Sequence, residues 1–179
     1  MIEKGKTYLV TGATGVIGKC LCDKIILLGA KVIALSRSKK NLQLLKDKYP
    51  NNITLISGDI SKKSTIKKAI KDIDGIFHLA ALAKGNQSGE AIESVNTNIL
   101  GTINLLELTL NQNLDFIVGT SSDKAVQISG VYGATKFLME RLFLEYENIN
   151  NKTNYRVVRL GNIIYSTDSV VEKWKNLIL

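Results

Sequence analysis

The segment TGATGVIG at residues 11–18 carries three glycines at a spacing that suits a phosphate ligand. Gly12 would permit a tight turn, Gly15 would let a pyrophosphate approach the backbone, and Gly18 would let a helix and a strand pack closely. If a helix opens directly after this loop, its first N–H groups and its partial positive charge face the phosphates. The segment indicates a dinucleotide site, although a bare turn would use glycine too.

Tyr132 and Lys136 are four residues apart in a stretch with helical periodicity, so both side chains face the same way. A nearby ammonium would stabilise a phenolate and lower the tyrosine pKa from about 10. Such a pair is a usable acid and base for an alcohol–ketone couple, and Lys136 could also hold a nicotinamide ribose. The spacing arises easily by chance, so the position of the pair, one loop after a strand, is the stronger argument.

A hydroxyl, an acid and a potential base follow one another at Ser122, Asp123 and Lys124. They come just after an expected strand, and ligands of open parallel sheets bind beyond the carboxyl ends of strands. Ser122 could hold a substrate hydroxyl there. A polar turn, in which Ser and Asp make local backbone hydrogen bonds, would explain the same residues equally well.

Short apolar runs alternate with helical stretches along the chain, and these elements must position the three segments. The expected strands are Thr7–Thr11, Lys31–Leu35, Ile53–Ser57, Gly75–Leu79, Phe116–Gly119 and Arg156–Leu160. The expected helices are Val16–Leu28, Asn41–Lys48, Ser64–Ile70, Glu90–Leu110 and Tyr132–Glu147.

This alternation predicts an α/β protein, a three-layer, doubly wound Rossmann fold with a mainly parallel sheet of about six strands. The expected strand order is 3-2-1-4-5-6, which places a ligand crevice beyond the carboxyl ends of strands 1 and 4. We expect residues 1–179 to form a single NAD(P)-binding domain, because no linker, repeat or low-complexity tract interrupts them.

The end of the second strand should decide between NAD and NADP. An acidic residue there would hold the ribose 2′-OH, but the sequence has Ser36, Arg37 and Ser38 instead. The planar fork of Arg37 can grip a 2′-phosphate, which favours NADP over NAD. A solvated basic loop is the alternative. Asp59, after the third strand, could accept from an adenine amino group or cap the following helix.

The composition excludes several classes of protein. Of 179 residues, 45% are hydrophobic and 22% charged, which is ordinary for a globular chain, and no apolar run is long enough for a membrane span. We expect a cytoplasmic protein. The net charge of the chain is +8, and the basic excess lies in the N-terminal half, where a lysine-rich helix is either a solvated face or a phosphate patch. No aromatic residues interleave with these lysines, so nucleic acid is not expected. Cys20 and Cys22 have no second pair, so no metal is expected.

Taken together, these motifs carry a family resemblance. TGATGVIGK, SRS, GDI, IFHLAAL, VNTNILGT, SSDKA, VYGATK and VVRLGNII follow one another in the order of the extended short-chain dehydrogenase/reductase family. SSDKA followed by YGATK resembles the branch of inverting UDP-N-acetylglucosamine 4,6-dehydratases, the CapD-like polysaccharide biosynthesis proteins. The resemblance covers nearly the whole chain, but family members are longer, so it implies that the substrate-binding lobe is largely absent here.

The resemblance also implies a lyase mechanism with roles for individual residues. Hydride passes from carbon 4 of the hexose to NADP while Tyr132 removes the hydroxyl proton. Lys124 then takes the proton at carbon 5, and Asp123 protonates the departing carbon-6 hydroxyl. We expect Lys124 to lie in a crowded, partly buried site, because a lysine base must be partly neutral. Asn98 and Asn162 match asparagines near the nicotinamide and the substrate, or are plain helix and turn residues.

The resemblance and the motifs together define a set of expected site residues. The catalytic candidates are Ser122, Asp123, Lys124, Tyr132 and Lys136, and Asn162 is the substrate-binding candidate. The expected NADP-binding residues are Gly12, Thr14, Gly15, Val16, Ile17, Gly18, Ser36, Arg37, Ser38, Asp59, Ile60, Ala80, Ala81, Asn98, Tyr132 and Lys136.

Three functions follow from this set. The first is an NADP-dependent nucleotide-sugar 4,6-dehydratase or its cofactor-binding portion. The second is a non-catalytic NADP-binding protein or half of a split enzyme, with a homo-oligomer or a companion chain supplying the missing lobe. The third is a nucleotide-sugar epimerase or reductase. It is less favoured, because the Asp123–Lys124 pair serves a dehydration best.

Overall fold

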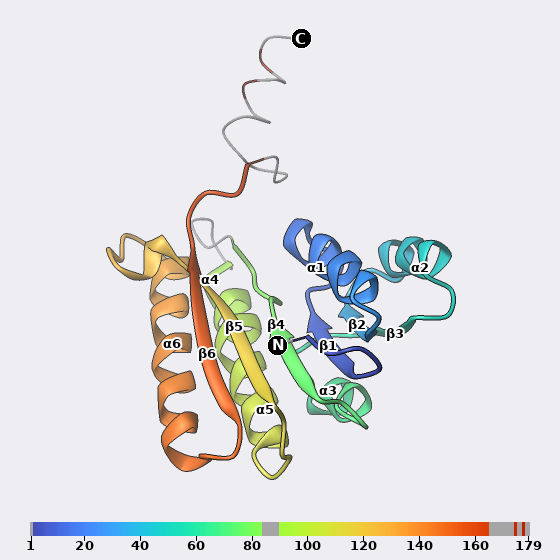
Figure 1. The fold of residues 1–179 in the computed structure, drawn as a ribbon. Helices are drawn as coiled ribbons and strands as arrows, with labels where there is room; N and C mark the ends of the chain where they lie inside the picture. Colours follow the sequence, from blue (N-terminus) through green and yellow to red (C-terminus); the bar gives the residue numbers. More distant parts are fainter. Residues whose placement is uncertain (1, 84–89, 165–173, 175–176, 178–179) are drawn as a thin grey trace.

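A six-stranded parallel sheet in the order β3-β2-β1-β4-β5-β6 forms the centre of the molecule (Figure 1). The computed structural model describes residues 2–83, 90–164, 174 and 177. The strands are β1 (Thr7–Thr11), β2 (Lys31–Ser36), β3 (Ile53–Ser57), β4 (Gly75–His78), β5 (Phe116–Ser122) and β6 (Asn154–Leu160). The expected fold class and strand order are therefore confirmed.

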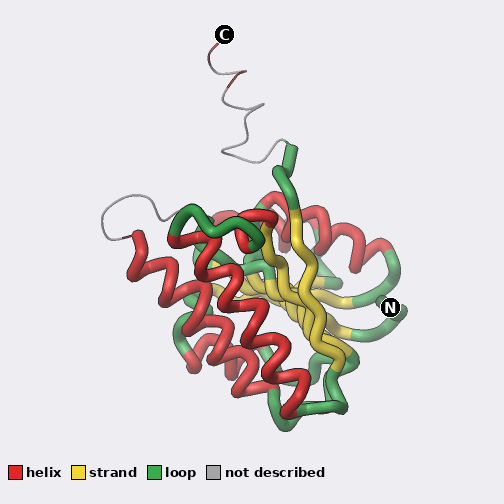
Figure 2. Tube along the Cα trace, turned by 90° about the vertical axis from the view of Figure 1, so that its left-hand side faces the viewer, coloured by secondary structure: helices red, strands yellow, loops and turns green. Residues whose placement is uncertain are grey.

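Helices cover the sheet on both faces, and Figure 2 shows the resulting layers with the strands between them. The α-helices are α1 (Val16–Leu27), α2 (Lys39–Lys48), α3 (Lys63–Ala69), α4 (Glu90–Ser94), α5 (Gly101–Thr109) and α6 (Val131–Ile149). A π-helical segment, η1 (Val95–Leu100), joins α4 to α5, and a 3₁₀ turn, η2 (Asp123–Ala125), follows β5.

Two apolar clusters hold the layers together, one on each face of the sheet. The first packs α1 and α2 against the sheet through buried residues such as Ile25 and Leu42. The second packs α3, α5 and α6 against the opposite face, with Leu105 and Phe143 fully or almost fully buried. Burying a side chain of this size stabilises the fold by roughly 1.5–3 kcal/mol. The sheet is thus fixed from both sides where these helices lie.

The structure corrects the expected end of the fifth strand. We expected this strand to stop at Gly119, but β5 continues to Ser122, which pairs with Leu160 of β6. Polar residue types after Gly119 suggested a loop, whereas the ladder to β6 keeps them extended. Ser122 is therefore held by the sheet, and only Asp123 and Lys124 belong to a turn.

The single helix expected over Glu90–Leu110 is interrupted. Between α4 and α5, the segment Val95–Leu100 forms hydrogen bonds of the π type. Segments of this kind are rare and occur frequently at functional sites. Within it, Asn98 is 1% exposed and turned into the protein. No described helix is long and apolar enough to cross a membrane.

Candidate functional site

The glycine loop between β1 and α1 is as tight as the sequence predicted. Gly12 has a φ of +68°, and a Cβ placed there would lie 2.8 Å from the Ala80 nitrogen. A Cβ at Gly18 would lie 2.3 Å from the Gly12 oxygen, so only glycine fits. At Gly15 the sole contact of an added Cβ is the Gly12 oxygen at 3.4 Å. Gly12 and Gly18 thus shape the loop, and Gly15 leaves one side open.

The N-terminus of α1 faces this open side, and no capping side chain accepts a hydrogen bond from its first N–H groups. Gly15 is the cap residue, and no acidic residue stands in the first turn. The amide of Lys19 makes the first helical hydrogen bond to the Gly15 carbonyl, so the N–H groups before it have no helical acceptor. Unsatisfied donors at the positive end of a helix suit an anion, and the loop therefore fits the diphosphate of a dinucleotide.

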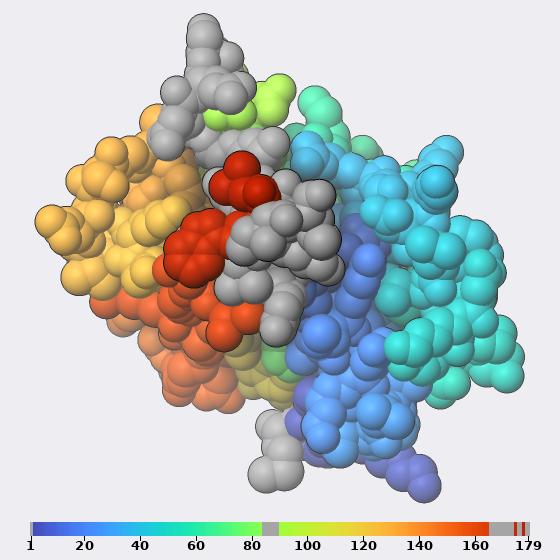
Figure 3. Space-filling model, turned by 90° about the horizontal axis from the view of Figure 1, so that it is seen from above, coloured from blue at the N-terminus to red at the C-terminus, as the bar shows by residue number. Residues whose placement is uncertain are grey.

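A crevice of about 270 Å³ opens beside the loop, at the carboxyl ends of the strands. It brings together most of the expected cofactor-binding residues and adds Thr97 of the π-helical segment, which the sequence did not single out. Its lining residues are Gly12, Thr14, Gly15, Leu35, Ser36, Arg37, Gly58, Asp59, Ile60, Leu79, Ala80, Ala81 and Thr97. Figure 3 looks onto this end of the molecule.

The end of β2 provides hydroxyls and a guanidinium at the margin of the crevice. The Ser36 hydroxyl lies 2.6 Å from the Thr14 hydroxyl, which ties the glycine loop to β2. The Ser38 hydroxyl accepts a hydrogen bond from the Asn41 amide and caps α2. Arg37 is exposed and lines the crevice. Its fork is thus available to a ligand phosphate at this margin.

Asp59 follows β3, and it was expected either to accept from an adenine amino group or to cap the following helix. It makes a local hydrogen bond of the capping kind. Its Oδ1 accepts from the Ser61 amide at 2.8 Å, although α3 begins only at Lys63. Burial opposes its charge, but the bonds from Ser61 and the charge of Arg37 outweigh this and hold the pKa of Asp59 below its usual range. Asp59 is therefore a carboxylate on the crevice wall, and the second oxygen can accept from a ligand.

A buried polar chain that the sequence did not reveal lies behind the crevice. Thr11 accepts from the Leu79 and Ala80 amides, so its hydroxyl donates to His78 Nδ1 at 2.8 Å. His78 Nε2 then donates to the Thr102 hydroxyl at 3.0 Å, and that hydroxyl donates to the Asn98 carbonyl. Burial, with the charge of Lys136, lowers the pKa of His78 to about 3, so the ring is neutral.

Asn98 closes this chain on its other side. Its side chain accepts from the Leu82 amide and donates to the Leu82 carbonyl, at 2.7 and 3.1 Å. It also donates to the Thr135 hydroxyl, which in turn donates to the Tyr132 carbonyl. These bonds fasten the loop after β4 to the first turn of α6, and the expected place of Asn98 near the nicotinamide stays a prediction.

Tyr132 and Lys136 stand on the first turns of α6, as expected. The Lys136 Nζ donates to the Thr120 carbonyl at 2.7 Å and lies 6.0 Å from the centre of the Tyr132 ring. Burial lowers the pKa of Lys136 to about 8. The expected lowering of the phenol pKa is wrong for this structure, because burial, assisted by the charge of Asp123, raises the pKa of Tyr132 despite a hydrogen bond with Ser122.

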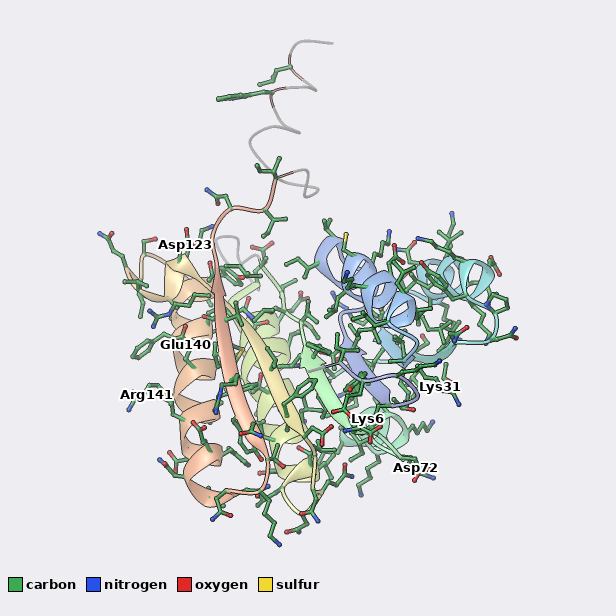
Figure 4. All side chains as sticks on the ribbon, viewed as in Figure 1. Lys6, Lys31, Asp72, Asp123, Glu140 and Arg141 are labelled. Carbon is green, nitrogen blue, oxygen red and sulfur yellow. The ribbon has the colours of Figure 1, made fainter. Side chains whose placement is uncertain are left out.

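The Ser122–Lys124 segment combines a fixed hydroxyl with two exposed charged residues. Ser122 donates to Asp123 Oδ1 at 2.8 Å, and the Lys124 amide donates to the same oxygen. The Lys124 ammonium lies 5.8 Å from the centre of the Tyr132 ring, so both catalytic candidates share one surface. The expectation that Lys124 is partly buried is wrong: η2 projects beyond the sheet and exposes it. Figure 4 shows Asp123 at the carboxyl end of the sheet.

For Asn162 the structure shows no hydrogen bond or ion pair with another described residue. It follows β6 and is exposed. Its place at the same end of the sheet as the crevice is compatible with a substrate contact, and that role stays a prediction.

Comparison with known proteins gives the relatives of this chain. The family described as polysaccharide biosynthesis protein matches residues 8–179. A Campylobacter jejuni UDP-N-acetylglucosamine 4,6-dehydratase (inverting) is 32% identical over 97% of this chain and 54% of its own length. A UDP-glucose 4-epimerase of Rickettsia bellii is 33% identical over 97% of this chain and 53% of its own length. The chain thus spans about half the length of these curated relatives.

Solved structures agree in fold. The X-ray structure of Pen from Bacillus thuringiensis superposes with a TM-score of 0.92 at 34% identity, over 99% of this chain and 56% of that one. A serine dehydrogenase complexed with NADP⁺ gives a TM-score of 0.79 at 25% identity, over 87% and 72%. A UDP-glucuronic acid 4-epimerase from Bacillus cereus in complex with NAD gives 0.77 at 25%, over 87% and 56%. Both nicotinamide nucleotides therefore occur among structural neighbours.

Proposed function

Because the chain belongs to the polysaccharide biosynthesis protein family of nucleotide-sugar dehydratases and epimerases, we propose that it is an NADP-dependent nucleotide-sugar 4,6-dehydratase or its cofactor-binding portion. The substrate is a UDP-N-acetylglucosamine-like nucleotide-sugar. One observation carries the proposal: the glycine loop, Tyr132, Lys136 and the Asp123–Lys124 pair all lie at the carboxyl end of one parallel sheet.

The N-terminus of α1 would hold the diphosphate of the cofactor, and the ends of β2 and β3 would hold its adenosine. Arg37 and Ser36 hold the 2′-phosphate, and Asp59 accepts from the adenine amino group. Lys136 holds the nicotinamide ribose. When bound, NADP⁺ supplies the hydride acceptor, and later the hydride donor, that oxidation and reduction of the sugar require.

The chain's own residues handle the protons. Tyr132 takes the proton of the sugar 4-hydroxyl, and the charge of Lys136 favours the resulting phenolate. Lys124 takes the proton from carbon 5, and Asp123 gives one to the departing 6-hydroxyl, so water leaves. Both residues are exposed, as residues that act on a bound sugar must be. The Lys124 ammonium lies 5.8 Å from the centre of the Tyr132 ring, and the charge of Asp123 acts on the Tyr132 phenol.

The preference for NADP over NAD rests on Arg37 and is tested by substitution. Arg37→Ala removes the fork that grips the 2′-phosphate, so the Kd for NADP rises at least about tenfold, which is a loss of about 1.4 kcal/mol. The Kd for NAD changes less than about twofold in the same titration calorimetry. Lys40→Ala, which removes an exposed positive charge from α2, is the matched control. Equal weakening of both nucleotides by Arg37→Ala would overturn the assignment.

The reaction itself is tested with the full chain. Incubation with NADP⁺ and UDP-N-acetylglucosamine should give a 4-keto product that has lost one water by mass spectrometry, and Tyr132→Phe should abolish it. A sample that binds NADP but forms no product favours the second hypothesis, a non-catalytic NADP-binding protein or half of a split enzyme. In that case a companion chain that restores turnover identifies the missing partner.

A nucleotide-sugar epimerase is the third candidate, favoured by the similarity to a UDP-glucose 4-epimerase. Tyr132 and Lys136 serve either reaction, whereas Asp123 and Lys124 serve the loss of water. A product that keeps its water and inverts at carbon 4 would select the epimerase. The cytoplasmic location stays a prediction beside these functions.

A further inference from the structure

An ion pair that no step above uses lies one helical turn below Lys136. Glu140 is four residues further along α6 and accepts two hydrogen bonds from Arg159 of β6. Arg159 Nε donates to Oε1 at 2.8 Å and an Arg159 terminal nitrogen donates to Oε2 at 2.7 Å. Two parallel hydrogen bonds of this kind fix the guanidinium plane against the carboxylate plane, and they are among the stronger polar contacts in proteins. Figure 4 marks Glu140 on α6.

The two partners of this pair differ in their access to water. Glu140 is 9% exposed and Lys136 is 2% exposed, whereas the Arg159 side chain is about half exposed. Arg159 lines an open groove of about 510 Å³ between α6 and β6. Charges inside the protein are screened less than charges at its surface. The Glu140 carboxylate therefore acts on Lys136 across one turn of a buried helix face, against the larger effect of burial on the Lys136 pKa, and water reaches the pair from the Arg159 side.

Few charged groups face Lys136 from the elements around it. Glu140 is the anion on its own helix, and it opposes the effect of burial on the Lys136 pKa. His78 of β4 is neutral, and β5 presents the Thr120 carbonyl. Tyr132 lies on the first turn of α6, with Lys124 of η2 on its ring and Asp123 acting on its phenol. From β6, Arg159 compensates Glu140.

We propose that Glu140 and Arg159 are a positioning pair that sets the charge state of Lys136. The proposal deepens the function proposed above, since it rests on the role of Lys136 beside Tyr132. The two members act in opposite directions. Glu140 favours the ammonium form, and Arg159 restrains that effect by compensating the carboxylate. Through Lys136, the pair sets the pH at which Tyr132 can exchange its proton.

A purely structural role makes a different prediction. If the pair only fastened α6 to β6, loss of either member would loosen the same contact and shift Lys136 in the same direction. The fold contains a natural control for this role, because Glu147 and Arg156 form a second ion pair between the same two elements. Glu147 lies three helical turns beyond Lys136 and does not act on it.

The experiment measures the titration of Lys136 directly in the full chain without cofactor. Correlation NMR of the lysine Cε and Nζ nuclei gives the midpoint, and Lys136→Arg assigns the signal. Glu140→Gln should lower the midpoint by about one pH unit, and Arg159→Gln should raise it by about half a unit. Glu147→Gln should leave it unchanged. Shifts in the same direction for both variants, or no shift in either, would overturn the proposal.

A second comparison covers the case in which Glu140→Gln fails to fold. Arg159→Lys keeps the positive charge but loses the fork, so it should leave the midpoint close to the wild-type value while Arg159→Gln raises it. Equal midpoints for these two variants would also overturn the proposal. Because no nucleotide is present, loss of NADP binding would contradict the proposed function without touching this result, and the converse also holds.

Discussion

The two halves of the sheet are built differently. Around β1, β2 and β3, helices lie on both faces, and Val32 to Leu35 of β2 are all buried. At β5 and β6, described helices cover one face, and in β6 only Tyr155 is buried, with Val158 47% exposed. Figure 1 shows α1 and α2 in front of the first half and no described helix in front of β5 and β6.

We expect this difference to separate cofactor binding from the proposed chemistry. Apart from Lys136, which lies on α6, the residues proposed for the cofactor lie in the half that is packed from two sides and supported by the buried chain through Thr11 and His78. Asp123, Lys124 and Asn162 stand at the margin of the half that is covered on one face. Substitutions of buried residues in the first half should therefore damage the fold and cofactor binding together. Substitutions at the exposed margin should change the reaction and leave both intact.

The largest effect is expected at Gly18. An alanine Cβ there would stand 2.3 Å from the Gly12 oxygen and 2.8 Å from the Ala13 backbone, so the loop and α1 must separate. Gly18→Ala should lower the free energy of unfolding by at least about 3 kcal/mol and abolish NADP binding, as measured by urea titration and calorimetry.

Gly161 supplies the matched control from the other half. A Cβ there meets nothing within 4 Å, so Gly161→Ala should change stability by less than about 0.5 kcal/mol. If the two alanine variants were equally stable, the contrast between the halves would be wrong.

The next effect is a pH dependence of stability that comes from His78, the only histidine in the sequence. Its pKa is about 3 in the fold against 6.5 for an ordinary histidine, so the unfolded chain takes up a proton that the folded chain does not. Stability should therefore fall as the pH drops below 6.5, by about 2 kcal/mol by pH 4.5.

Replacing the histidine isolates this contribution. His78→Asn should be less stable at pH 7, because the bonds to Thr11 and Thr102 are disturbed, but its stability should vary little between pH 6.5 and 4.5. Urea titrations at several pH values measure this slope. An unchanged slope in His78→Asn would show that another group causes it.

The smallest effect on the fold is expected at the exposed margin. Asp123→Asn keeps an oxygen that can accept from the Lys124 amide, so stability should change by less than about 0.5 kcal/mol and the Kd for NADP should stay the same. Loss of the acid should slow product formation by about a hundredfold or more in the mass-spectrometric assay. Weakened NADP binding in this variant would place Asp123 in the cofactor site instead.

The sequence predicted the sheet well, because buried parallel strands are continuous apolar runs that local composition reveals. It also predicted Gly12 and Gly18, since their spacing reflects a steric need. It missed the last three residues of β5, because Thr120, Ser121 and Ser122 are polar and only their partners in β6 keep them extended. The π-helical segment has no periodic signature of its own and escaped for that reason.

The charge states of the candidate site residues were harder to predict than their positions. The pair of Tyr132 and Lys136 was found from its spacing, but the direction of the phenol pKa depends on burial, which spacing does not give. Lys124 was expected in a partly buried site, and the projection of η2 exposes it. The hydrogen-bonded chain through His78 joins this residue to Thr11, which is 67 positions away in the sequence, and to Thr102, which is 24 positions away. Local sequence patterns cannot reveal contacts over such separations.

The central claim is that the loop between β1 and α1 holds the diphosphate of a nicotinamide nucleotide whose ring reaches Tyr132. A crystal structure of the chain soaked with NADPH tests it most directly. We expect phosphate density at the N-terminus of α1 and the nicotinamide against Tyr132. An empty crevice, a crevice filled by the protein's own side chains, or a nucleotide bound elsewhere would contradict this expectation.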